Sequence, residues 1–261
     1  MRPVTTSLSY RFVCRAHSLT VQLALLALSM IAMAAGLPDC HAGSFAVSPT
    51  RIELSDAQSR TVIQVDNPTA DPITIQLTVM AWSHPEGKEE LHPSRDILAT
   101  PQIITVQPRA SQLVRVGALR KADPTRELAY RLSLDEIPAP PPPDFKGLQV
   151  VLKVGLPIFL KPAVDSKAKL AVSLMAAGPR QFNLRIANEG NGSAQLSDIS
   201  LHPADAPETL LAKLANSIYV LAGQQRTVSL KHEGLDLDKT FLIKAATSSG
   251  PLQFHAIPVS K

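Results

Sequence analysis

The residue types that most often carry enzyme chemistry are present in this 261-residue chain, but they show no catalytic spacing. The histidines beyond residue 42 are scattered, at positions His84, His92, His202, His232 and His255. No His-Glu-x-x-His, Gly-x-Ser-x-Gly or phosphate-binding glycine loop occurs. We therefore expect no catalytic residue, no metal site and no cofactor, and a protein that is not an enzyme.

The clearest chemical pattern is apolar and lies in one stretch, Leu148–Pro162. Its even-numbered residues are apolar from 148 to 160, whereas the opposite face carries Gln149, Lys153 and Lys161. Side chains alternate between the two faces of a β-strand, so this pattern predicts a strand with one continuous apolar face. Proline cannot donate a ladder hydrogen bond, and Pro157 therefore predicts that at least this end lies at a sheet edge. An apolar edge strand is an aggregation hazard, so we expect it to pair with another chain.

The N-terminus has the layout of a secretory signal peptide. Three arginines precede an apolar run from Leu19 to Ala35, and small residues follow at 42–44. We expect a signal peptide over 1–42 with cleavage after Ala42, and an earlier cut near Ala34 is the alternative. An uncleaved membrane anchor is the competing interpretation of the same run.

Removal of this segment would leave a chain without cysteine, because Cys14 and Cys40 both precede the cut. Thiol catalysis and zinc–thiolate sites are then excluded, and residues 43–261 suffice for two domains of about 100 residues each. The signal would take three arginines and one aspartate from a chain of net charge +4, which leaves +2. No basic cluster interleaved with aromatic rings occurs, so we expect no nucleic-acid binding.

The rest of the chain predicts short strands separated by turn residues, without a convincing amphipathic helix. In the first half we expect strands at 45–54, 60–65, 72–82, 97–106, 112–116 and 128–134, with a polar loop at 83–92 and a stiff proline-rich loop at 138–143. In the second half we expect strands at 170–174, 181–186, 197–201, 217–221, 227–230, 241–246 and 253–259. This spacing is typical of β-sandwiches, so the fold class is all-β, with a domain boundary at Lys161–Pro162.

Four stretches, taken in this order, resemble a known family: Ser48–Arg51, Gln112–Val116, Tyr130–Pro138 and Leu148–Pro162. They are similar to the PapD-like periplasmic chaperones of the chaperone–usher pilus pathway, and look most like the archaic or alternate branch. The resemblance implies two immunoglobulin-like β-sandwich domains set at an angle, here 43–161 and 162–261. It also implies a periplasmic location, pilin or fimbrial subunits and an outer-membrane usher as partners, and no membrane insertion after signal cleavage.

The resemblance further implies which residues bind the subunit. In this family the last strand of the first domain donates alternating apolar side chains to the groove of an incomplete pilin. The matching positions are Leu148, Val150, Leu152 and Val154, which coincide with the row found from alternation alone.

The family also binds the C-terminal carboxylate of the pilin through an arginine on the first strand and a basic residue on the donor strand. Arg51 matches the arginine, but Pro157 stands where the best-known members carry lysine. We expect Lys153 to be the second anchor, with an edge lysine that discourages strand pairing as the alternative. For Arg51 the alternative is an ordinary surface arginine.

Two other functions compete with this interpretation. An exported two-domain β-sandwich that binds carbohydrate or a surface protein, without chaperone activity, would need an exposed aromatic or carboxylate cluster, and Trp82 is the only tryptophan. An exported hydrolase would need convergent histidine and acidic groups that sequence order does not reveal.

Overall fold

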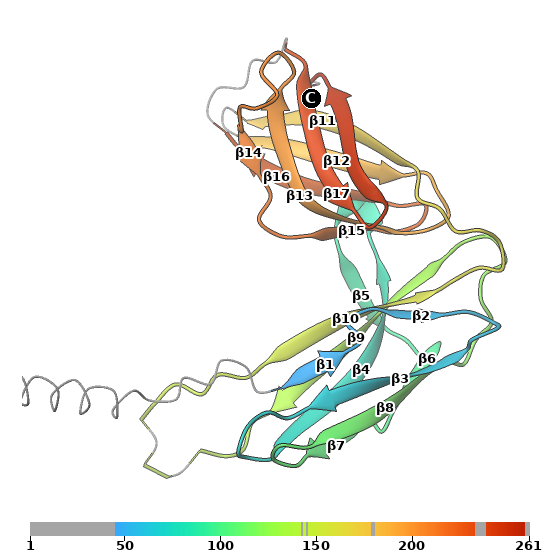
Figure 1. Ribbon diagram of the computed structural model, residues 1–261, viewed down its shortest axis with the longest axis vertical. Coiled ribbons are helices and arrows are strands. Elements are labelled where there is room, and N and C mark those ends of the chain that lie inside the picture. The colour runs from blue at the N-terminus through green and yellow to red at the C-terminus, as the bar shows by residue number, and fades with distance from the viewer. Residues whose placement is uncertain (1–44, 142, 145, 179–180, 233–238, 259–261) are drawn as a thin grey trace, which may run out of the picture. The chain divides into compact units, whose positions relative to one another are not determined.

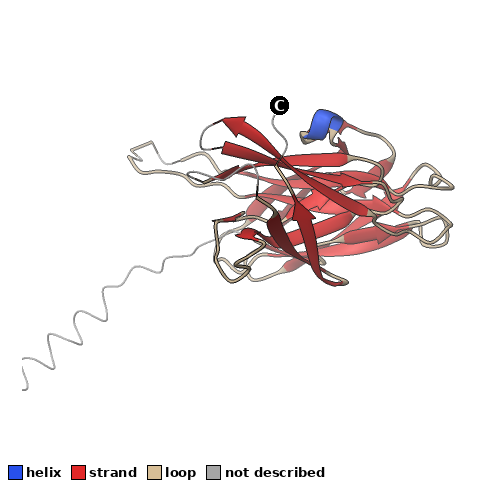
Figure 2. Cartoon of the chain, turned by 90° about the horizontal axis from the view of Figure 1, so that it is seen from above, coloured by secondary structure: helices blue, strands red, loops and turns tan. Residues whose placement is uncertain are grey.

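The computed structural model describes residues 45–141, 143–144, 146–178, 181–232 and 239–258. These residues fold into β-sheets, and the one helical turn among them is η1 (Pro85–Gly87), shown in Figure 2. No helix in this part of the chain is long and apolar enough to cross a membrane. The expected signal peptide, residues 1–42, lies outside the described residues.

The first domain contains two packed sheets. In the smaller one the strands follow the order β1-β3-β8-β6, with antiparallel pairing throughout (Figure 1). In the larger one the order is β2-β10-β9-β4-β5, and β7 also pairs with β4. The strands are β1 (Ala46–Ser48), β2 (Ile52–Leu54), β3 (Arg60–Asp66), β4 (Ile73–Ser83), β5 (Glu90–Pro93), β6 (Ile97–Thr100), β7 (Ile103–Val106), β8 (Ser111–Ala118), β9 (Leu128–Ile137) and β10 (Lys153–Leu160).

Alternation builds the core of this domain. Every second residue of the long strands points between the sheets, and the fully buried side chains include Ile63, Ile75, Leu132 and Ile158. Burial of each such side chain contributes roughly 1.5–3 kcal/mol relative to an exposed position. The same alternation leaves the other face of each strand to solvent or to the second domain.

Two segments that we expected to be single strands are divided. Residues 45–54 form β1 and β2, and residues 97–106 form β6 and β7, with the two members of each pair in different sheets. Pro49 and Pro101 lie at the two divisions, where a residue without an N–H interrupts the ladder. Each proline thus marks the point where the chain crosses from one sheet to the other.

The prediction of a polar loop at 83–92 is partly wrong. It contains η1 and most of β5, which pairs with the end of β4. Leu91, the one apolar side chain of β5 apart from Pro93, packs beside Trp82. A strand with so few apolar residues has no recognisable period, which explains why the sequence pattern missed it.

The second domain is also built from sheets. One has the order β11-β12-β16 and the other β14-β13-β17-β18, with β15 paired to β13. Its core contains Leu174, Leu184, Leu201 and Ile243. The strands are β11 (Leu170–Gly178), β12 (Gln181–Asn188), β13 (Ala194–Pro203), β14 (Ala212–Lys213), β15 (Ile218–Val220), β16 (Gln225–Lys231), β17 (Phe241–Thr247) and β18 (Gly250–Ala256).

An aromatic cluster connects the two domains. The ring of Tyr219 lies 5.3 Å from that of Trp82 and 5.7 Å from that of Phe159, centroid to centroid. Leu221 completes this buried group. The outward face of β10 is therefore covered at its C-terminal end by the second domain, directly before the proposed boundary at 161–162.

Candidate binding site

The strand β10 is paired on both sides only near its C-terminal end. β9 accompanies it from Lys153 to Leu160, whereas β2 pairs in parallel only with residues 158–160. Along 153–157 no other strand of the described chain pairs with its second edge. Pro157 itself lies on the part of β10 that has an open edge, but residues 158–160 beyond it are paired on both sides. The predicted edge position therefore holds for Pro157 and not for the end of the strand that follows it.

The backbone groups on that edge can be assigned from the hydrogen bonds. The N–H of Lys161 donates to the carbonyl of Leu54 over 2.8 Å, so odd-numbered residues direct their backbone groups toward β2. In strand pairing this orientation alternates from residue to residue. Lys153 and Gly155 therefore present their N–H and C=O groups at the open edge, where another strand can form hydrogen bonds with them.

The apolar residues at the even-numbered positions from 148 to 160, here called the apolar row, divide into two parts. Leu156, Ile158 and Leu160 are buried in the core, and Leu152 and Val154 pack partly against it. Leu148 and Val150 are instead 87% and 79% exposed. The row thus begins on the surface of the domain and ends inside it.

The strand expected from Leu148 begins only at Lys153, and this part of the prediction is wrong. The register pairs Lys153 with Asp135, so Val150 would lie opposite Pro138. That residue and the prolines after it have no N–H for a ladder. Residues 148–152 consequently lie outside the ladder, although Leu152 exchanges hydrogen bonds with Glu136, from its N–H to the carboxylate and from the Glu136 N–H to its carbonyl.

Arg51 directly precedes β2 and lies among charged and aromatic neighbours. Its Nε donates to Oε1 of Glu53 at 2.9 Å, and its Cζ lies 4.2 Å from the ring centroid of Phe159. Glu53 also pairs with Lys161. Partial burial acts to raise the pKa of Glu53, but hydrogen bonds from Lys161 and Arg51 outweigh it, so the pKa is lowered and the carboxylate stays charged.

The structure does not bring Lys153 to Arg51. The Nζ of Lys153 lies 3.1 Å from Oδ1 of Asp135, and its side chain is 70% exposed. Along the strand it is four residues from the level of Arg51, or about 13 Å. Its observed contact is therefore a cross-strand ion pair at the surface.

A second arginine lies near Arg51, and the sequence analysis missed it. Arg131 of β9 places its Cζ 4.1 Å from the ring centroid of Trp82, and its Nη2 is 3.1 Å from Oε1 of Glu89. Glu89 also contacts Arg226 of the second domain at 3.4 Å. Arg131 belongs to the stretch Tyr130–Pro138 that carries part of the family resemblance, but only the pairing of β9 with β10 shows that it lies near Arg51.

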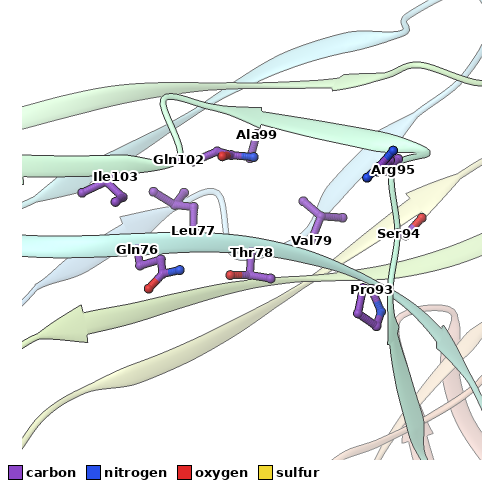
Figure 3. A pocket seen from close by; sticks show the side chains of 10 residues that line it. All are labelled: Gln76, Leu77, Thr78, Val79, Pro93, Ser94, Arg95, Ala99, Gln102 and Ile103. Carbon is purple, nitrogen blue, oxygen red and sulfur yellow. The ribbon is translucent and has the colours of Figure 1, made fainter.

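A groove of about 420 Å³ lies elsewhere in the first domain, between β4 and the segment from Pro93 to Ile103 (Figure 3). Leu77 and Val79 point into it from β4, and Arg95 is the only ionisable residue in its lining. It holds no combination of groups for acid–base or nucleophilic chemistry. The apolar row and the arginines near β10 are thus the better candidates for a binding site.

Comparisons with known proteins identify the class. Residues 44–164 match the family model for the pili and flagellar-assembly chaperone, PapD N-terminal domain. Over these residues the chain is similar to PapD-type chaperone domains, and the resemblance to PapD-like proteins is confirmed. The matched family is one of chaperones rather than enzymes. No curated protein sequence gives a significant match to the chain.

Solved structures show the same fold over both domains. A CsuC–CsuE chaperone–tip adhesion subunit pre-assembly complex from archaic chaperone-usher Csu pili of Acinetobacter baumannii matches with a TM-score of 0.64 and 16% identity, covering 83% of this chain and 100% of that one. The Salmonella enterica SafA pilin complex with the SafB chaperone gives 0.57 and 15%, with 82% and 97% covered. The E. coli chaperone DraB gives 0.54 and 19%, with 82% and 95% covered. The expected fold, two immunoglobulin-like β-sandwich domains, is confirmed.

Proposed function

We propose that this protein is a periplasmic chaperone that binds pilus or fimbrial subunits by donor-strand complementation and delivers them to an outer-membrane usher. The observation that carries the proposal is the exposure of Leu148 and Val150 at the start of an apolar row that is half-buried at Leu152 and Val154 and buried from Leu156 on. The matched chaperone family and the pilin and tip-subunit complexes among the similar structures support it.

Two features of the segment suit it to complete an unfinished sheet. The edge groups of Lys153 and Gly155 can pair with a subunit strand, which satisfies backbone groups that would otherwise be unpaired. The exposed apolar side chains of Leu148 and Val150 can enter a groove, and each contributes roughly 1.5–3 kcal/mol before ordering costs are deducted. Leu152 and Val154, which are half-buried against the chaperone's own core, continue the apolar surface toward that core.

Arg51 is the proposed site for the C-terminal carboxylate of the subunit. Its guanidinium is partly exposed, and its terminal nitrogens can grip a carboxylate through two parallel hydrogen bonds. Such an anchor fixes the strand register, because a slip of one residue turns the apolar row away from the groove. Lys153, the sequence-based candidate for the second basic residue, pairs with Asp135 and lies about 13 Å from the level of Arg51, so Arg51 carries the proposed anchor.

Coexpression with a pilin-like subunit in the periplasm tests the proposal. We expect the tagged chain to copurify with the subunit, and the subunit to be degraded or to aggregate without it. Purified chain that protects no subunit and captures a glycan instead would contradict the proposal and favour the exported binding module.

A further inference from the structure

The register of β10 on β9 continues past the end of the ladder into Leu148–Leu152, here called the donor segment. In an antiparallel pair, each step back along one strand meets a step forward along the other. The even-numbered residues of the segment, taken backwards, therefore fall opposite Glu136, Pro138 and Pro140. Two of these three facing residues are prolines.

The two prolines prevent a complete ladder along the donor segment. Odd-numbered residues of this strand direct their backbone groups toward β2, so even-numbered residues direct theirs toward the residues that follow β9. Proline has no N–H, and the carbonyls of Leu148 and Val150 therefore face residues without a backbone donor. The side chains of Leu148 and Val150 are exposed as well, so burial does not fix their position.

Two side-chain hydrogen bonds keep the donor segment in this register. The carboxylate of Glu136 accepts the N–H of Leu152 at 2.9 Å, and the N–H of Glu136 donates to the carbonyl of Leu152 at 3.0 Å. The side-chain amide of Gln149 donates to the carbonyl of Ala139 at 2.9 Å. Gln149 and Ala139 face each other in the continued register, so both contacts join residues that a ladder would pair.

The Glu136 contact is the stronger of the two. A hydrogen bond from an N–H to a carboxylate is charge-assisted, and this one is partly buried, whereas the bond from Gln149 to Ala139 is neutral and exposed. The neighbouring ion pair of Lys153 with Asp135 is a surface contact between side chains and adds little. Glu136 instead binds the backbone of the donor segment.

A donor segment that is already extended can enter a groove at a lower entropic cost. Residues that become ordered on binding lose conformational entropy, and the affinity falls accordingly. A segment held in strand register before binding has already lost part of that entropy. Its first apolar side chains meanwhile remain exposed for a subunit.

We propose that Glu136 is a positioning residue that holds the donor segment in strand register for the incoming subunit, with its carboxylate bound to the N–H of Leu152. This inference rests on the proposed chaperone function and adds to it a residue that acts through the chaperone's own chain. Glu136 acts through the backbone of Leu152, and the positions of Leu148 and Val150 follow from it.

Hydrogen exchange of the free, full chain tests the positioning without any subunit. In Glu136→Ala the amide of Leu152 should exchange about tenfold faster than in wild-type chain, as expected for the loss of one charge-assisted hydrogen bond. Glu136→Gln keeps an acceptor and should restore most of the protection. Asp135→Ala removes the same charge one residue earlier and is the matched control, with less than about a twofold change. Unchanged exchange in Glu136→Ala, or an equal increase in Asp135→Ala, overturns the inference.

Coexpression with a pilin subunit tests whether binding uses this arrangement. The yield of complex should fall about three- to tenfold with Glu136→Ala and stay within about twofold of wild type with Asp135→Ala. A normal yield with Glu136→Ala would also overturn the inference, whereas no complex even with wild-type chain would contradict the proposed function itself.

Thermal unfolding of the free variants shows whether they are folded. Glu136→Asp tests the same contact if Glu136→Ala does not fold, because it keeps the charge but withdraws the carboxylate by one methylene. It should raise the exchange rate of the Leu152 amide by a similar factor, and wild-type exchange in a folded Glu136→Asp would count against the positioning role.

Discussion

The two parts of the apolar row in 148–160 have the same alternating pattern and opposite surroundings. Leu156, Ile158 and Leu160 lie in the core of the first domain, whereas Leu148 and Val150 are exposed. The difference comes from their neighbours, since β9 continues beside the first group but gives way to prolines beside the second. An alternating apolar pattern thus identifies a face, and the adjacent strand decides whether the chain's own core or a partner covers it.

The strongest contrast should be seen in stability. Replacement of Ile158 by Ala removes buried methyl groups and should lower the free energy of unfolding by about 2–5 kcal/mol. Val150→Ala should change it by less than about 0.5 kcal/mol, because the side chain is exposed. Urea denaturation of both variants measures this difference, and equal losses would show that the two parts of the row do not differ.

The basic residues extend the comparison to the carboxylate anchor. Arg51→Ala should reduce the recovery of chaperone–subunit complex by more than tenfold, because a charge-assisted contact is lost. Lys153→Ala is the matched control and should retain most of the complex, since the observed partner of Lys153 is Asp135. Affinity purification from periplasmic extract measures the yield. A normal yield with Arg51→Ala would contradict the assignment of Arg51 as an anchor.

The two faces of the exposed segment can be compared with one residue type. Val150 and Val151 are adjacent, and both are exposed. Val150→Asp should lower complex yield by about tenfold or more, because a charge would enter the subunit groove, whereas Val151→Asp should have a much smaller effect. Both free variants should keep the wild-type unfolding midpoint. Equal losses of complex would mean that the even-numbered residues are not the donor row.

A further contrast concerns pH and the contact between the domains. Burial, reinforced by Arg226 and Arg131, lowers the pKa of His84 from 6.5 to about 4, and its ring packs edge-on to Trp82 at 5.5 Å. The unfolded chain therefore binds this proton more readily, so stability should fall as the pH drops from about 6.5 toward 4. His84→Phe should flatten the fall in unfolding midpoint between pH 7 and 5. An unchanged slope in the variant would show that His84 does not titrate as described.

Much of the fold could be predicted because local pattern and local chemistry agree in it. The long strands β3, β4, β8 and β9 follow directly from alternation between turn residues. The pattern failed where neighbours decide the outcome. Pro49 and Pro101 divide two expected strands between sheets, and the apolar pattern alone could not show that β10 begins only at Lys153.

The sequence by itself determined the all-β class, the edge position of Pro157 and the apolar face of 148–160, because alternation and the missing proline N–H are local properties. Only the tertiary structure decided which part of that face is exposed and which basic residues lie at the same level of the sheet. Arg51 and Arg131 are 80 positions apart in the sequence, and strand register brings them to the same level beside Pro157. Register depends on long-range pairing and packing, and no short stretch of the sequence contains it.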